Sequence, residues 1–148
     1  PRSTLFPYTT LFRSISIDNY LLEQSILNLV KNAKESLEEG EVFSPEIRIV
    51  TRVLRKEFLG QTQHKTVCSI SVTDNGPGIP KDLKDSIFFP MISSKATGSG
   101  LGLSITQGII SQHNGIIKCK SEPGKTEFSI LIPIKHQVHD QELRRANA

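Results

Sequence analysis

Two asparagines lie in the middle of a segment with an apolar stripe, where they could serve a metal or a phosphate group. Asn28 and Asn32 are four residues apart, so on a helix they project from the same side. Asparagine is a mediocre helix former, and two of them in mid-helix need an explanation. A carboxamide oxygen is a hard ligand that suits a Mg²⁺ ion carrying waters and bridging phosphates. For an isolated pair of this kind, hydrogen bonds to nearby backbone groups are the better explanation.

Two clusters of glycines could bring the backbone close to a ligand. Gly76 and Gly78 follow a strand-like segment, and Gly98, Gly100 and Gly102 precede a helix-like one. Glycine allows positive φ, and the free N–H groups at a helix start bind anions. Neither cluster fits a P-loop, because no Gly-Lys-Ser/Thr follows, and the second follows a loop instead of the strand that a dinucleotide fingerprint requires. Each cluster alone is better explained as an ordinary turn or helix start.

The cysteines and the charge exclude several classes of function. Cys68 and Cys119 lie in strand-like runs and match no metal-ligand spacing, which indicates two reduced packing residues. The formal charge of +3 falls to +1 once Arg2 and Arg13 are set aside, and the remaining charges of both signs are interspersed. This pattern argues against a nucleic-acid-binding surface. No apolar run is long enough to cross a membrane and no signal peptide is recognisable, so we expect a cytoplasmic protein without a membrane partner.

The two asparagines require a helix to position them. Asp18 is a plausible N-cap and Gly40 a plausible stop. Between them, apolar residues recur at spacings of three and four, which predicts one amphipathic helix. These residues are Leu22, Ile26, Leu29, Val30, Ala33 and Leu37.

The remaining elements predict a two-layer domain. We expect strands at 47–53 and 68–73, a turn at 60–64, a short helix after Pro80, a loop over 90–100, a helix over 101–113, and strands at 116–121 and 126–134. This order of helix, two strands, loop, helix and two strands predicts an α/β fold, a two-layer α/β sandwich with a mixed sheet and helices packed on one face.

Both ends of the chain differ from this pattern. Residues 1–14 show neither a helical nor a strand period and resemble translated sequencing-adapter read-through, so we interpret them as a non-native or disordered segment. Residues 136–148 form a polar C-terminal tail that we expect to fray. The predicted domain therefore covers residues 15–135.

Four motifs occur in a fixed order along this domain. They are Asn-Leu-Val-Lys-Asn-Ala at 28–33, Asp-Asn-Gly-Pro-Gly-Ile-Pro at 74–80, Phe-Phe-Pro-Met-Ile-Ser-Ser-Lys at 88–95 and Gly-Ser-Gly-Leu-Gly-Leu at 98–103. Together they resemble the N, G1, F and G2 boxes of the ATP-binding (Bergerat-fold) domain of histidine kinases. The Phe-Pro-Met sequence and the compact Gly-Lys-Thr-Glu-Phe at 124–128 are similar to the nitrogen-regulation branch of that family.

The resemblance implies ATP and Mg²⁺ as ligands. It implies that Asp74 accepts a hydrogen bond from the adenine amino group, that Asn32 binds Mg²⁺ with Asn28 beside the phosphates, and that Lys95 reaches phosphate oxygens. Phe88 and Phe89 would anchor a lid over residues 90–100 that nucleotide orders. The remaining implied contacts are Gly76, Gly78, Ile79 and Thr126 at the base, and Gly98, Gly100, Leu101 and Gly102 at the phosphates.

The resemblance also implies a mechanism. Related gyrase, chaperone and mismatch-repair ATPases carry a glutamate one turn before the metal asparagine, whereas this chain has Asn28, and an amide is no general base. We therefore expect ATP to be kept for another nucleophile, a histidine on a dimerisation domain that would precede Ile15. None of the four histidines of this chain has the sequence context of that acceptor. The implied partners of the whole protein, a homodimer, are an NtrC-type response regulator and a PII-type signal protein.

Two other functions remain open from the sequence. One is a stand-alone serine kinase of the anti-sigma type, which uses the same fold at a similar length. The other is a nucleotide-binding module without a transfer role.

Overall fold

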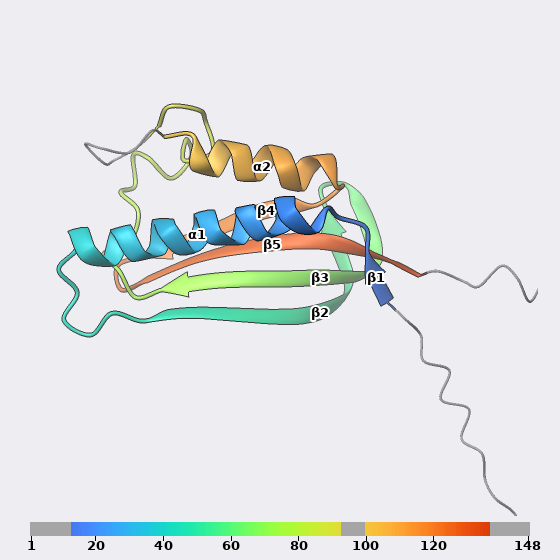
Figure 1. Cartoon of the computed structure of the whole chain (residues 1–148), viewed down its shortest axis with the longest axis horizontal. Coiled ribbons are helices and arrows are strands. Elements are labelled where there is room, and N and C mark those ends of the chain that lie inside the picture. Colours follow the sequence, from blue (N-terminus) through green and yellow to red (C-terminus); the bar gives the residue numbers. More distant parts are fainter. Residues whose placement is uncertain (1–12, 93–99, 137–148) are drawn as a thin grey trace, which may run out of the picture.

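The computed structural model describes residues 13–92 and 100–136, in which two helices lie on one face of a five-stranded sheet (Figure 1). The helices are α1 (Asn19–Glu39) and α2 (Gly102–Gln112). The strands are β1 (Arg13–Ile15), β2 (Ile47–Leu59), β3 (Thr62–Asp74), β4 (Ile116–Glu122) and β5 (Lys125–His136). This arrangement confirms the two-layer α/β sandwich. β1 begins two residues before the boundary expected at residue 15, and residues 1–12 and 137–148 lie outside the described part.

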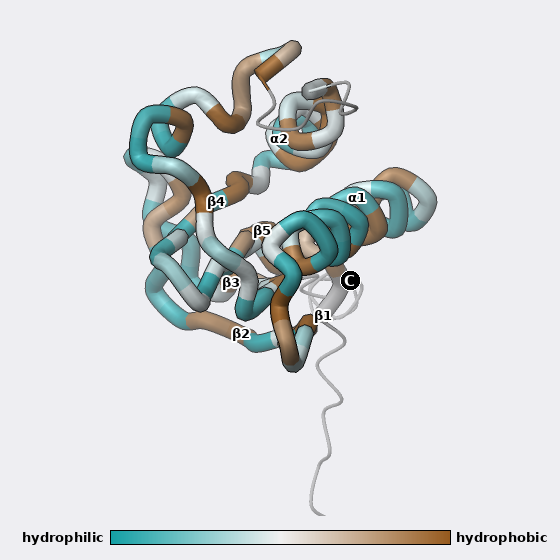
Figure 2. The backbone as a smooth tube through the Cα atoms, turned by 90° about the vertical axis from the view of Figure 1, so that its left-hand side faces the viewer, coloured by the Kyte–Doolittle hydropathy of each residue, from teal (hydrophilic) through white to brown (hydrophobic). Residues whose placement is uncertain are grey.

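Helix α1 begins and ends where the sequence predicts. The Asp18 carboxylate accepts a hydrogen bond from the N–H of Leu21 at 3.1 Å, and Gly40 follows the last helical residue. The buried side chains of the helix lie four residues apart, at Ser25, Leu29, Ala33 and Leu37. This spacing places one face of α1 on the sheet, while much of its outward side is hydrophilic (Figure 2).

The sheet is antiparallel rather than mixed, which corrects our expectation. In the described residues the strands are ordered β1-β5-β3-β2, β4 also pairs with β5, and every pairing is antiparallel. β3 and β4 run in the same direction, because the connection through α2 crosses from one end of the sheet to the other. They are not neighbours, however, because β5 lies between them and is antiparallel to both.

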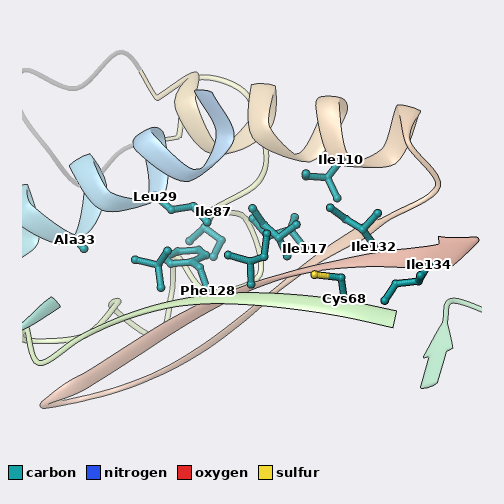
Figure 3. Packing of buried hydrophobic residues seen from close by; sticks show 12 residues of the cluster. Leu29, Ala33, Cys68, Ile87, Ile110, Ile117, Phe128, Ile132 and Ile134 are labelled. Atoms are coloured by element: carbon teal, nitrogen blue, oxygen red, sulfur yellow. The ribbon is translucent and has the colours of Figure 1, made fainter. Parts of the chain in front are cut away.

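The main core fills the space between the helices and the sheet (Figure 3). Leu29 from α1, Ile110 from α2 and Ile130 from β5 are each 0% exposed. Cys68 is also part of this cluster, and both cysteines are free thiols, which confirms their reading as packing residues. α1 and α2 are therefore held against the sheet and against each other by the same apolar cluster.

The strands of the β2–β3 hairpin extend beyond the expected ranges 47–53 and 68–73, and the hairpin makes a second core. The expected turn at 60–64 is confined to two residues between Leu59 and Thr62. Leu59 packs with Val67 and Leu131 on the side of the sheet away from the helices, because Leu131 alternates along β5 with core residues. The hairpin thus covers part of the outer face.

The segment that follows Pro80 is a series of turns and not the short helix that we expected. The N–H groups of Leu83, Ser86 and Phe89 bond to the carbonyl oxygens three residues earlier, at 3.1, 2.9 and 2.9 Å. Because only every third residue makes such a bond, no continuous helical ladder forms.

Candidate functional site

Three polar side chains form a transverse row at one end of the sheet. Asp74 on β3 is opposite Thr126 on β5, which is opposite Ser121 on β4. Asp74 and Thr126 are each 4% exposed. The hydroxyl oxygens of Ser121 and Thr126 are 2.9 Å apart, and the backbone N–H of Ile79 donates to Ser121 Oγ at 2.8 Å. We call Asp74, Thr126 and Ser121 the polar row.

The carboxylate of Asp74 uses one oxygen to hold its own loop. Oδ1 accepts a hydrogen bond from the N–H of Gly76 at 2.9 Å. The second oxygen, Oδ2, makes no hydrogen bond to any residue that the structure describes, so it can accept one from a ligand. Burial raises the pKa of Asp74, and the hydrogen bond from Gly76 opposes that shift. The site therefore holds a buried acceptor whose ionised form is not paired with a cation of the described chain.

The loop after Asp74 is fastened to the turn between β4 and β5. The N–H of Gly124 in that turn donates to the carbonyl oxygen of Gly76 at 3.0 Å. Gly78 has φ +86°, and a Cβ there would lie 2.8 Å from the carbonyl oxygen of Glu122. A side chain at residue 78 would meet both backbone strain and a steric clash. The predicted residues Gly76, Gly78 and Ile79 thus come together with Asp74 and Thr126.

The two predicted asparagines have different surroundings. The amide nitrogen of Asn28 donates to Thr106 Oγ1 on α2 at 2.9 Å. Its side chain also lies against Gly102, where a Cβ would be 2.9 Å from Asn28 Nδ2. Asn28 therefore joins α1 to the beginning of α2. Asn32 is half-buried and makes no side-chain hydrogen bond to a described residue.

The side chain at the N-cap position of helix α2 does not bond to the N–H groups of the first turn. Leu101 stands at the N-cap position without a side-chain hydrogen bond to the first turn. The preceding Gly100 has φ +64°, and its carbonyl oxygen accepts from the N–H of Met91 at 3.0 Å. N–H groups in this position attract anions, and they lie on the same helix start that Asn28 contacts.

The predicted lid is only partly covered by the structure. Lys95 and Gly98 lie outside the described residues. The ring of Phe88 packs edge-to-face on Phe128 in the core, with ring centroids 6.3 Å apart. Phe89 is 63% exposed. Phe88 anchors this segment as expected, whereas Phe89 is turned to solvent and does not.

Three further residues of the site were not singled out from the sequence. Ser121 could have been found from hairpin register, because the short turn after it places it opposite Thr126. Lys84 donates from Nζ to the carbonyl oxygen of Ser121. Asn75 accepts from the N–H of Glu46 at 2.8 Å through its side chain, which fixes the loop between α1 and β2. The last two contacts join segments with no pattern that links them in the sequence.

The described residues contain no group of three or more His, Cys, Asp or Glu side chains that could hold a metal ion. Neither helix in the described ranges has the length and apolar character that a membrane crossing needs. Any metal at this site would depend on ligands such as amide oxygens, waters and a nucleotide.

Residues 17–136 match the family of histidine kinase-, DNA gyrase B- and HSP90-like ATPases. The chain belongs to that family, and within it to the catalytic domains of histidine kinases. The chain is 43% identical over 120 residues to the sensory histidine kinase/phosphatase NtrB of Vibrio alginolyticus, covering 81% of this chain and 34% of the relative. It is 39% identical to NtrB of Rhizobium leguminosarum bv. phaseoli, covering 76% of this chain and 30% of that protein.

Among solved structures, the catalytic domain of the histidine kinase ThkA in a nucleotide-free form is 31% identical. Its TM-score is 0.61, with 79% of this chain and 68% of that chain covered. Full-length ShkA in complex with AMPPNP is 24% identical with a TM-score of 0.62, over 78% of this chain and 22% of that one, and supports the fold alone. The chain spans about a third of the length of the NtrB relatives that it matches.

Proposed function

We propose that this domain binds ATP with Mg²⁺ and donates the γ-phosphoryl group to a histidine on a separate dimerisation domain, as part of an NtrB-like sensor kinase. The observation that carries this proposal is Asp74, a buried carboxylate with one oxygen committed to its own loop and the other left for a ligand. The similarity to NtrB over most of the chain supports the same assignment.

The polar row suits adenine. Adenine presents an amino group beside a ring nitrogen, which is a donor next to an acceptor. Asp74 would accept from the amino group and Thr126, its neighbour across the ladder, would serve the ring nitrogen. Guanine presents an oxygen and an N–H in the reverse order, so the Asp74 carboxylate would repel it. Gly76, Gly78 and Ile79 would leave room for the base beside this row.

The opposite end of the site suits the phosphates. Asn32 offers one amide oxygen from a half-buried position. One hard ligand is enough for a Mg²⁺ ion that brings its waters and binds ATP phosphates, so the residues fit the ion. The bound ion would neutralise phosphate charge. The N–H groups of Gly100, Leu101 and Gly102 would bind phosphate oxygens, and Lys95 and Gly98 would contribute from the lid.

The chain would hold ATP without hydrolysing it quickly. The residue one turn before Asn32 is Asn28, and its amide is bound to Thr106. An amide cannot take a proton from water. Transfer would instead require a histidine imidazole nitrogen to form a bond to the γ-phosphorus while the bond from that phosphorus to the β,γ-bridging oxygen breaks, releasing ADP.

The similarity to NtrB also supports a proposal for the whole protein. It would be a cytoplasmic homodimer that passes phosphate to an NtrC-type response regulator under the control of a PII-type signal protein, in nitrogen regulation. The present chain would be a monomer in solution, because the dimerisation domain would supply the contacts. A gel-filtration or light-scattering measurement that finds a tight dimer would contradict this last point.

The test is phosphoryl transfer between two separate proteins. The chain is mixed with γ-³²P-labelled ATP, Mg²⁺ and the dimerisation domain of Vibrio alginolyticus NtrB. We expect acid-labile, alkali-stable label on the dimerisation domain. An acceptor variant with glutamine in place of its histidine, and a reaction with EDTA, provide the controls and should show no label.

Two variants of the chain sharpen this test. Asn32→Ala should abolish transfer, whereas Gln107→Ala, on the exposed side of α2, should leave it unchanged. If the chain binds ATP but no label reaches the acceptor, the transfer proposal is wrong and a nucleotide-binding module remains. If ATP is not bound at all, the whole proposal fails.

A further inference from the structure

Ser121 lies at the centre of the hydrogen bonds that join the base site to the rest of the domain. Its hydroxyl contacts Thr126 Oγ1 at 2.9 Å and accepts from the N–H of Ile79 at 2.8 Å. Its carbonyl oxygen accepts from Lys84 Nζ. Three segments, namely β5, the loop after β3 and the turns after Pro80, therefore meet at one residue of β4.

The single hydroxyl hydrogen of Ser121 decides what Thr126 can do. A serine hydroxyl donates once and accepts up to twice. If Thr126 donated to Ser121, the Ser121 hydrogen would have no acceptor among the described residues, and Thr126 could only accept from a ligand. If Ser121 donates to Thr126, both of its roles are filled, and the Thr126 hydrogen is directed to the ligand. With a hydrogen-bond acceptor in the pocket, only the second arrangement satisfies both hydrogens.

The neighbour of Thr126 favours the second arrangement. Asp74, directly opposite on β3, is an acceptor for a ligand donor. A base that places an amino group at Asp74 places an acceptor ring nitrogen next to it, and that nitrogen requires a donor from the protein, directly or through one water.

We infer that Ser121 is a positioning residue, which makes Thr126 a hydrogen-bond donor to the ring nitrogen beside the adenine amino group. This inference rests on the proposed binding of ATP. Ser121 itself does not touch the base in this scheme. It contributes to recognition through the Thr126 hydroxyl and through the loop after β3, whose Ile79 N–H donates to Ser121 Oγ.

The test compares ATP with 1-deaza-ATP, in which a C–H group replaces that ring nitrogen. Dissociation constants are measured by isothermal titration for the wild-type chain and for Ser121→Ala. We expect the wild type to bind ATP about 3- to 10-fold more tightly than 1-deaza-ATP, the usual size of one neutral hydrogen bond. In Ser121→Ala this preference should fall to less than about 2-fold, because the Thr126 oxygen no longer accepts the bond from Ser121 that holds its side chain, so the hydroxyl can rotate away from the ring nitrogen.

Ser129→Ala is the matched control. Ser129 is also a serine in the sheet whose hydroxyl contacts another hydroxyl, that of Ser71 at 2.9 Å. It alternates along β5 with core residues and so lies on the outer face. Ser129→Ala should keep the full preference for ATP. Ser121→Cys, nearly the same size but a weak donor, provides a second variant if Ser121→Ala does not fold, and should also lose the preference.

The outcomes separate this inference from the proposed function. A wild type that binds ATP without any preference over 1-deaza-ATP overturns the inference. A Ser121 variant that binds both nucleotides more weakly by the same factor also overturns it, since the loss of a merely structural residue would have that effect. A wild type that binds neither nucleotide overturns the proposed function itself, and the inference with it.

Discussion

Asp74→Asn should weaken ATP binding and stabilise the empty domain at the same time. Asparagine can keep the amide oxygen at the position of Oδ1, where the N–H of Gly76 donates at 2.9 Å. It replaces Oδ2 with an NH₂ group, which is a donor. The variant therefore keeps the loop contact and changes only the atom that would face the adenine amino group.

The loss of binding follows from that one atom. A hydrogen bond to a charged group contributes about 1.5–3 kcal/mol, so ATP affinity should fall about 10- to 100-fold. The new NH₂ group can donate to the guanine oxygen, so the preference for ATP over GTP should also decrease. Isothermal titration of the wild type and the variant with each nucleotide measures both effects.

The gain in stability follows from the pKa of Asp74. Burial raises this pKa, so the folded state holds the proton more tightly than the unfolded state does. The corresponding stability is fully present below the ordinary pKa of about 4 and is lost as the pH rises through the higher folded-state pKa. Asparagine bears no charge at any pH. Asp74→Asn should therefore melt at a higher temperature than the wild type near pH 7.5, and the difference should shrink at acid pH.

The two halves of this prediction can fail separately. ATP affinity of Asp74→Asn within about 2-fold of the wild type would refute the role of Asp74 in base recognition. A lower melting temperature of the nucleotide-free variant at pH 7.5 would refute the view that the buried, ionised carboxylate destabilises the folded state. Asn75→Asp, at the next residue but with its side chain turned to the loop before β2, is the control for a general effect of charge near the site.

Three other changes test the geometry of the site. Gly102→Ala places a methyl group against the Asn28 side chain and should lower the free energy of unfolding by about 1–3 kcal/mol in urea titrations. The control Gly108→Ala lies on the same helix with open space around it and should raise the free energy of unfolding by about 0.5–1 kcal/mol. Gly78→Ala should both destabilise the domain and abolish ATP binding, because φ is +86° there and the turn backbone leaves no room; unchanged titrations would contradict this. Burial raises the pKa of Cys119 to about 11. Alkylation of this thiol by iodoacetamide should therefore be slow at pH 8 and become faster as the pH approaches its pKa. Rapid labelling of the folded chain at pH 8 would contradict this expectation.

The sequence predicted those parts of the fold that local rules control. Helix α1 begins after Asp18 and ends before Gly40 because a cap and a stop flank a clear apolar stripe. It did not predict the antiparallel sheet, since the order of elements cannot reveal that β5 is inserted between β3 and β4. Nor did it predict the second core, which forms only when the long hairpin bends over the sheet.

The candidate site was predicted as a set of motifs rather than as a network. Asp74 and Thr126 were both chosen from the sequence, yet their direct opposition follows from strand register. Asn28 was expected beside phosphates, and the structure adds a hydrogen bond to Thr106, 78 positions away. No sequence period links such residues, so contacts of this kind become visible only when the helices are packed.

The position of β5 has a consequence for how the domain is synthesised. β5 is the last described strand to leave the ribosome, yet it pairs with β1, β3 and β4 and lies between the last two. A nascent chain that ends before residue 125 lacks the centre of its sheet, so that β3 exposes an unpaired edge and β1 and β4 have no strand partner, which favours aggregation. Thr126 and its partners also come together only at that stage. With Thr126 in the proposed nucleotide site, nucleotide would not assist the early steps of folding, and its binding would report that the last strand is in place.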